Sequence, residues 1–134
     1  MATIHRFEDL LCWQKARELD NAVNKVTQYR AFSKNRALVI QIERASGSVM
    51  DCIAEGFGRD GNKEFRQKLS EAKASSQEVK SQLHRALARK YISEEEHAAI
   101  YSLAEETERL MGGMIRYLNK SAMLGSKFAD ENPL

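Results

Sequence analysis

Cationic side chains recur every seven residues in the middle of the chain, at Arg59, Arg66, Lys73 and Lys80. On an α-helix this spacing places them in one row along one face. Arg66, Lys73 and Lys80 have no acidic residue three or four positions away, the spacing at which helical charges pair. Because an unpaired cationic row repels itself, an anion or an acidic surface is expected to face it. The row is therefore a candidate binding site, which Lys63, Arg85, Arg89 and Lys90 enlarge.

Two interpretations of this row stay open. It can follow the phosphate backbone of RNA or DNA, since such contacts need cations along a groove and no base-reading motif. It can equally be an ordinary solvated surface, or pair with carboxylates of an acidic partner or another protomer. The net charge of +2 and the pI of about 8.6 do not decide between them. No recognition helix or base-stacking motif is visible, so we expect nucleic-acid binding to depend on shape and salt.

Motifs for catalysis or cofactor binding are not found in the sequence. His5, His84 and His97 are scattered, and no two Glu-x-x-His pairs occur as a di-metal bundle requires. There is no phosphate-binding glycine loop, dinucleotide turn or nucleophile elbow. Gly56-Phe57-Gly58 is expected to end a helix and not to follow a strand. We therefore expect no enzymatic activity, metal, cofactor or small-molecule substrate.

The composition predicts one globular domain. The chain has 134 residues, of which 43% are hydrophobic and 30% charged. No apolar run approaches the roughly 18 residues of a membrane span, and the N-terminus lacks the apolar segment of a signal peptide. We expect a cytoplasmic protein without membrane contact. Cys12 and Cys52 are too few and too far apart for a disulfide framework, and are read as small core or boundary residues.

Apolar residues recur at helical spacing in four segments, about 7–28, 35–57, 62–89 and 93–120. The predicted core stripes are Leu10, Trp13, Ala16, Leu19, Val23 and Val26 in the first segment and Leu38, Ile42, Ala45, Val49 and Ile53 in the second. In the third they are Phe65, Leu69, Ala72, Ser76, Val79, Leu83 and Ala86, and in the fourth Ile100, Ala104, Thr107, Met111, Met114 and Leu118. No β-strand signal competes with them.

Helix boundaries are predicted from capping residues. Ser33 is expected to cap the second segment, and glycines 56 and 58 to end it in the left-handed conformation that glycine tolerates. Asp60-Gly61-Asn62 predicts a tight turn and an N-cap for the third. Ser93 and Glu96 form a capping box at the start of the fourth.

The short connections make consecutive helices antiparallel neighbours. The predicted fold is an all-α, up-down-up-down four-helix bundle over residues 1–120, followed by a flexible tail over 121–134. The fourth segment is apolar over more than the roughly 100° that a bundle helix needs. Its additional apolar residues are Tyr101, Leu103, Leu110, Ile115 and Tyr117. They form either a wide buried stripe or a second contact face for another protomer.

Two stretches of the sequence match a known family. The segment Phe7-Glu8-Asp9-Leu10, followed by Trp13-Gln14-Lys15-Ala16-Arg17-Glu18-Leu19, resembles the opening of bacterial four-helix bundle proteins encoded in 23S rRNA intervening sequences. The segment Ile53-Ala54-Glu55-Gly56-Phe57-Gly58-Arg59 and the pattern from Glu64 to Leu83 resemble the family's central signature. Together these matches cover about Phe7 to Leu118.

The resemblance implies a homopentameric barrel of bundles without enzymatic activity. The family includes the accessory variability determinant of diversity-generating retroelements, which has a basic surface and binds a reverse transcriptase and nucleic acid. This implies an oligomeric accessory protein that binds RNA or DNA, or alternatively a protein-binding scaffold. The chain departs from the family pattern at Ser48 to Cys52, which lack the usual proline, at Gly61 in place of a capping serine, and at Lys90 in place of a glycine.

Overall fold

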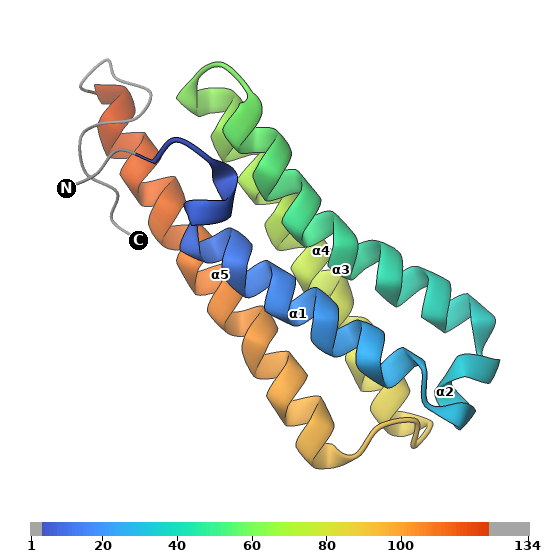
Figure 1. Ribbon diagram of the computed structural model, residues 1–134. Coiled ribbons are helices and arrows are strands. Elements are labelled where there is room, and N and C mark those ends of the chain that lie inside the picture. The colour runs from blue at the N-terminus through green and yellow to red at the C-terminus, as the bar shows by residue number, and fades with distance from the viewer. Residues whose placement is uncertain (1–3, 124–134) are drawn as a thin grey trace.

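The computed structural model describes residues 4–123, with side chains for 4–120, and that part of the chain contains helices and no strands (Figure 1). A short 3-10 helix, η1, spans Phe7–Asp9. It is followed by α1 (Leu11–Thr27), α2 (Arg30–Lys34), α3 (Arg36–Gly58), α4 (Asn62–Ala88) and α5 (Glu94–Met123). The long helices agree with the predicted segments within a few residues at each end. The tail predicted over 121–134 falls outside the described residues, except that α5 continues to Met123.

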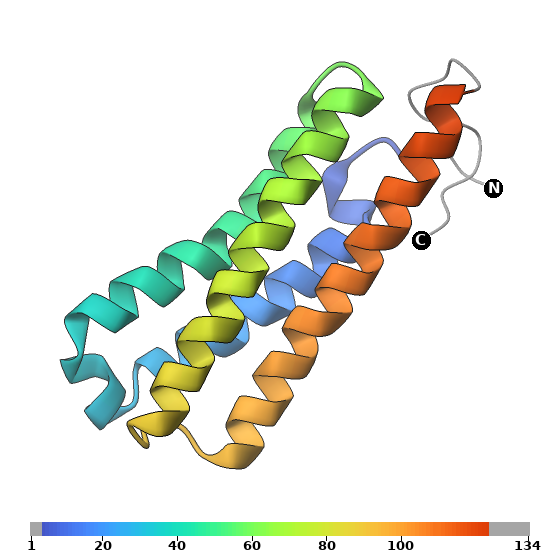
Figure 2. The same ribbon diagram turned by 180° about the vertical axis from the view of Figure 1, so that it is seen from behind.

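The four long helices lie side by side along their lengths and form a bundle (Figures 1 and 2). Helix α3 packs against α1 and α4, and α5 packs against the other sides of α4 and α1, so the four enclose one core. The start of α4 lies beside the end of α5, where Asn62 Nδ2 donates to the carbonyl of Leu118 at 3.2 Å. Farther along α4, Lys80 meets Glu108, which comes earlier in α5.

The predicted core stripes of α3, α4 and α5 are buried throughout, which confirms the helical spacing read from the sequence. In α1 the prediction is wrong at one position. Cys12 is fully buried, whereas Trp13 is half-buried against Phe7, with ring centroids 5.1 Å apart. Burial raises the pKa of the Cys12 thiol to about 12, because a thiolate is poorly solvated in the core. Cys52 is half-buried, so both cysteines are core or boundary residues as predicted.

The predicted cap of the second long helix is wrong. Ser33 lies inside the short helix α2, where its hydroxyl donates to the carbonyl of Arg30 at 2.8 Å. The side chain of Asn35 caps α3 instead, since its Oδ1 accepts from the amide of Leu38 at 3.2 Å. Helix α2 has five residues, which is too short for an apolar period to be visible in the sequence.

Glycines 56 and 58 were predicted to end α3 in the left-handed conformation, and neither adopts it. Helix α3 ends at Gly58, but of glycines 56, 58 and 61 it is Gly61 that has a positive φ, of 100°. Gly56 is instead needed for close packing, because a Cβ there would lie 2.8 Å from Lys68 Cβ and 2.9 Å from Phe65 Cδ1. Asn62 is the buried first residue of α4 and does not cap it.

The capping box at the start of α5 is confirmed. The amide of Ser93 donates to Glu96 Oε1 at 2.8 Å, and the amide of Glu96 donates to Ser93 Oγ at 3.1 Å. The hydroxyl of Tyr29 also donates to the carboxylate of Glu96. These bonds connect the start of α5 to the end of α1 and hold this end of the bundle together.

Candidate nucleic-acid interface

The structure distributes the six predicted cations over more than one face. Arg59 is the C-cap residue just after α3, and the other five lie on α4. Lys63, Lys73 and Arg85 are exposed, whereas Arg66 and Lys80 are half-buried. Arg66 donates from Nη1 to Asn119 Oδ1 of α5 at 3.0 Å. Arg85 donates from Nη1 to Gln41 Oε1 of α3 at 3.0 Å and therefore points toward the opposite neighbour of α4.

Lys80 was predicted to be an unpaired cation, and this prediction is wrong. Its Nζ lies 3.4 Å from Glu108 Oε1 and 4.8 Å from the centroid of the Tyr101 ring. The two charged side chains are only 14% and 13% exposed. Glu108 is far from Lys80 in the sequence, so a search three and four positions away cannot find it. The pair makes Lys80 part of the contact between α4 and α5.

Glu108 is also bonded to two other side chains of α4. Its Oε2 accepts from Ser76 Oγ and its Oε1 from Gln77 Nε2, both at 2.8 Å. With Lys80, these residues form a polar network between the two helices. A carboxylate with three donors is well compensated for its loss of water. This part of α4 is therefore organised to hold its own bundle together.

Lys73 is unpaired as predicted for the row, and Lys63, which was expected to enlarge the row, shares this character. Both are exposed, and within residues 4–120 neither makes an ion pair. Lys68, between them, pairs with Glu55 of α3 at 3.0 Å and with Glu71 at 3.4 Å, which raises the pKa of its ammonium. The charge of Lys68 is therefore neutralised by carboxylates, whereas the ammonium groups of Lys63 and Lys73 are exposed to solvent.

The additional apolar residues of α5 are half-buried in the single chain. All five pack against the core of the bundle. Among the described residues, the exposed large hydrophobic side chains are Leu11, at 40%, and Ile40, at 48%, and neither belongs to α5. The wide apolar arc of α5 is covered in part by its own bundle, and its use as an oligomer interface stays a prediction.

Two of the histidines meet where α4 and α5 face each other. The rings of His84 and His97 have centroids 4.8 Å apart, and Tyr101 lies 5.5 Å from each. Burial, and to a lesser degree the neighbouring His84, lowers the pKa of His97. No group of three or more metal-ligating side chains occurs in the part of the chain that the structure describes. The pair is best read as part of the helix contact.

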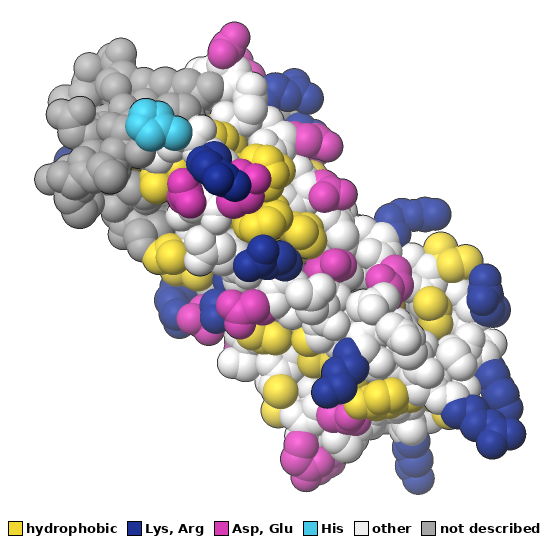
Figure 3. All heavy atoms as spheres, in the orientation of Figure 1, with side chains coloured by type: hydrophobic (Ala, Val, Ile, Leu, Met, Phe, Trp, Pro, Cys, Tyr) yellow, Lys and Arg dark blue, Asp and Glu magenta, His cyan; other side chains and the backbone are white. Residues whose placement is uncertain are grey.

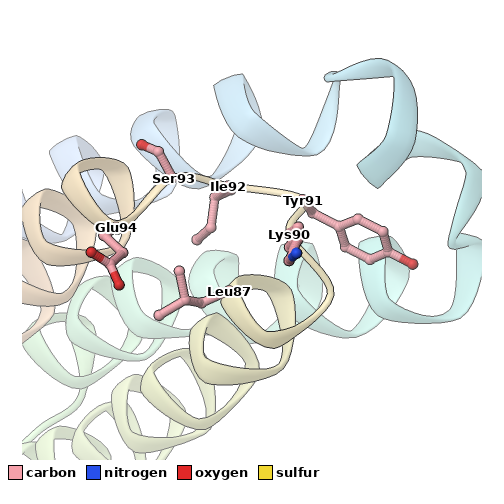
Figure 4. A pocket seen from close by; sticks show the side chains of 6 residues that line it. All are labelled: Leu87, Lys90, Tyr91, Ile92, Ser93 and Glu94. Atoms are coloured by element: carbon pink, nitrogen blue, oxygen red, sulfur yellow. The ribbon is translucent and has the colours of Figure 1, made fainter.

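An open pocket of about 550 Å³ lies at the turn between α4 and α5 (Figure 4). Leu87 and Ile92 point toward each other across it, while the ring of Tyr91 points away. Its polar lining is Lys90, Ser93 and Glu94, and the Ser93 hydroxyl already accepts from the amide of Glu96. The Ser93 hydroxyl therefore acts in the capping box of α5.

Sequence reasoning found only half of a second group of cations at this end of the bundle: it added Arg85, Arg89 and Lys90 to the row and missed Arg30, Lys34 and Arg36. The six come from two segments without any acidic residue, 21–42 and 79–93, and this absence of acids is the signal that would have found the whole group. The segments meet where the rings of Phe32 and Tyr91 stack at 5.2 Å and Asn35 Nδ2 donates to the Tyr91 hydroxyl at 3.1 Å. Figure 3 shows Lys and Arg side chains gathered at this end, around α2.

None of the described helices is long and apolar enough to cross a membrane. Similarity to a solved structure supports the fold. The chain superimposes with a TM-score of 0.73 on the crystal structure of a protein of unknown function from the S23 ribosomal protein family of Bacteroides thetaiotaomicron. The two share 22% sequence identity, and the alignment covers 79% of this chain and 99% of the other. No curated protein matches the chain.

The family model of the 23S rRNA-intervening sequence proteins matches residues 8–113. This range covers the segments on which the resemblance was based, from the turn at η1 through most of α5. The match therefore includes α1, α3 and α4 and the first two thirds of α5. The chain belongs to the family of 23S rRNA-intervening sequence proteins.

Proposed function

We propose that this protein is a non-catalytic, cytoplasmic accessory protein that binds the phosphate backbone of RNA or DNA through cations of α4. In this proposal the bundle is antiparallel, up-down-up-down, and assembles into a homopentamer, as the family resemblance implies. The finer form of the proposal is an accessory variability determinant that also binds a retroelement reverse transcriptase. It is tested by co-purification with a reverse transcriptase encoded beside the gene.

The observation that carries the proposal is the exposure of Lys63 and Lys73 without an ion pair in the described region. A helical rise of about 1.5 Å per residue places them about 15 Å apart along α4, the length of about four base steps of a duplex. Arg66 lies between them and bonds only to a neutral amide in that region. Three cations with no carboxylate partner fit a row of phosphates, which needs charge and no base-reading motif.

The test is the affinity for a labelled RNA over a series of salt concentrations. Replacing Lys63, Arg66 and Lys73 with glutamate is expected to lower affinity at least tenfold. The slope of log affinity against log salt concentration should become shallower by about 0.7 for each phosphate that the protein no longer neutralises. Lys80 is left unchanged, because replacing it would break its ion pair with Glu108, and a loss of RNA affinity could then result from a loss of stability.

The matched control carries three charge reversals elsewhere, at Arg6, Arg17 and Arg109, which are exposed and lie outside α4. Both triple variants have the same net charge. Equal RNA affinity in the α4 variant and the control would show that the position of the cations is irrelevant, and would overturn this site.

The second candidate function is a protein-binding scaffold without a nucleic-acid role. It is favoured by the half-buried apolar residues of α5, which leave apolar area for another protomer or partner. Replacing Leu110 and Ile115 with glutamate is then expected to dissociate the oligomer in light-scattering measurements. If this variant keeps the mass of the unaltered protein, α5 is not the interface.

A further inference from the structure

Six cations lie close together at the end of the bundle formed by α2, the start of α3 and the end of α4. We call this surface the cationic end, and its residues are Arg30, Lys34, Arg36, Arg85, Arg89 and Lys90. All six side chains are exposed. None of them makes an ion pair within the described residues. The acidic residues of this end, Glu94 to Glu96, begin α5; Glu94 lines the same pocket as Lys90, and Glu96 accepts from Tyr29, the residue before α2.

Lys90 has a backbone conformation that disfavours lysine. Its φ is 60°, and it is the one non-glycine residue of the described chain with a positive φ. It ends α4 in a Schellman motif, in which the amide of Lys90 donates to Leu87 at 2.9 Å and the amide of Tyr91 to Ala86 at 3.0 Å. Glycine adopts this conformation at the least cost. The lysine thus places an ammonium group at this end against the preference of the backbone.

Arg36 is a second cation that stands where the local structure disfavours it. It is the first residue of α3, where the helix dipole is positive and disfavours a cation. Helix dipoles account for Arg85 and Arg89, because they lie at the negative end of α4, where Arg89 Nη1 reaches the Arg85 carbonyl at 3.5 Å. They do not account for Arg36 or for the conformation of Lys90. Departures from local preference of this kind are expected at functional sites.

We infer that the cationic end holds the phosphodiester backbone of a nucleic acid. This inference rests on the proposed function and adds to it, because it assigns a second surface, besides the exposed face of α4, to the same nucleic acid. Six exposed cations from α2, α3 and the end of α4 can neutralise more phosphates than two can, and affinity grows with that number. Lys63 and Lys73, in contrast, lie along a single helix.

The surroundings favour a nucleic acid over an acidic protein. Protein interfaces depend on aromatic or aliphatic side chains that enter a partner's pocket. At the cationic end Phe32 is fully buried and Tyr91 is half-buried against it. Ile40 is the large hydrophobic residue exposed nearby, and a single exposed aliphatic residue is normal on any protein surface. The surface is therefore charged without an apolar anchor.

The decisive variant is Lys90→Gly in the full chain. Glycine removes one cation and relieves the positive φ, so we expect the midpoint of thermal unfolding to rise by about 4 °C. The affinity for a labelled single-stranded RNA should fall about fivefold, as expected when one phosphate is left without its cation. Stability and binding therefore change in opposite directions, and a damaged fold cannot produce this result. An affinity that stays unchanged or rises would overturn the role of Lys90.

A triple variant tests the rest of the surface. With Arg30, Lys34 and Arg36 replaced by glutamine, we expect affinity to fall at least tenfold and the salt dependence to decrease by about 2. Glutamine replacements at Arg6, Arg17 and Arg109 serve as the control. Replacing both Lys63 and Lys73 with glutamine tests the exposed face of α4.

The outcomes separate the two proposals. If the unaltered protein binds no RNA at low salt, the proposed function and this inference both fail. If binding is lost in the Lys63 and Lys73 variant and unchanged in the triple variant, only the cationic end is excluded. Unlabelled poly-glutamate is added as a competitor. If it displaces the RNA at equal charge concentration, the surface accepts acidic protein equally well and the assignment to nucleic acid is overturned.

Discussion

Lys80, in the middle of α4, and Lys90, just beyond its end, carry the same ammonium group in opposite surroundings. Lys80 is 14% exposed and meets a carboxylate and an aromatic ring of α5. Lys90 is exposed and has a disfavoured φ of 60°. It lies in the segment 79–93, which contains no acidic residue. The contrast teaches that the charge of a lysine does not reveal its role. The role depends on whether another helix supplies the partner.

The comparison also separates stability from binding. The middle of α4 uses its polar side chains to hold α5, so changes there should reduce the free energy of unfolding. The cationic end is held by backbone and aromatic contacts, which include the capping box, the Schellman motif and the stacking of Phe32 on Tyr91. Its charged side chains are therefore available for binding.

The largest expected effect is at Glu108. Replacing it with alanine leaves the ammonium of Lys80 without its carboxylate and removes the acceptor of Ser76 and Gln77. We expect the free energy of unfolding to fall by about 3 kcal/mol, measured by urea denaturation, because a largely buried charge loses its partner. Glu105→Ala, on the exposed side of α5, is the control. A cost no larger than that of the control would remove the distinction between the two regions.

The next effect concerns the capping box that holds the cationic end. Ser93→Ala removes the acceptor of the Glu96 amide. We expect a loss of about 1 kcal/mol in the free energy of unfolding, which is typical of N-cap replacements. Ser102→Ala, at an exposed position inside α5, should cost nothing. If Ser93→Ala is equally neutral, caps do not maintain this end of the bundle.

A smaller effect is expected from the histidine pair between the two regions. Burial lowers the pKa of His97, so the unfolded chain binds a proton before the folded one does. Stability is therefore complete above the ordinary histidine pKa of about 6.5 and falls as the pH drops from there toward the lower pKa of the folded state. Thermal unfolding across this range measures the dependence. His97→Gln should flatten it, and an unchanged profile in that variant would contradict the assignment.

The smallest effect on stability is expected at the cationic end itself. With Arg30, Lys34 and Arg36 replaced by glutamine, the free energy of unfolding should change by no more than about 0.5 kcal/mol, because the replaced side chains are exposed. Urea denaturation of the same protein samples used for RNA binding provides the measurement. A loss above about 1 kcal/mol would mean that these cations hold the fold and would weaken their assignment to binding.

Most of the fold was predictable because helix periodicity and capping are local. The stripe from Phe65 to Ala86 is buried as predicted, and the bonds between Ser93 and Glu96 follow from their spacing. Helix α2 and the cap at Asn35 were missed, because five residues are too few to show a period. Trp13 was placed in the core stripe but is half-buried, whereas Cys12, read as a core or boundary residue, is fully buried.

The candidate site was predictable to a smaller extent. The exposure of Lys63, Lys73 and Arg85 agrees with the row read from the sequence, but the pairing of Lys80 does not. Glu108 is brought to Lys80 by the packing of α5 on α4, and no spacing within one helix can reveal that contact. At the cationic end Arg85, Arg89 and Lys90 were read as part of the row, but Arg30, Lys34 and Arg36 were missed, because the two segments meet only in the folded chain.

By itself, therefore, the sequence determined what depends on neighbours along the chain. This includes the four long helices, their buried stripes, the capping box and the charge of each face. Only the tertiary structure decided which charges are neutralised, because Coulomb interactions act through space and the partner usually lies on another helix. It placed Glu108 against Lys80, and it brought Lys90 beside α2 in a conformation that its residue type disfavours.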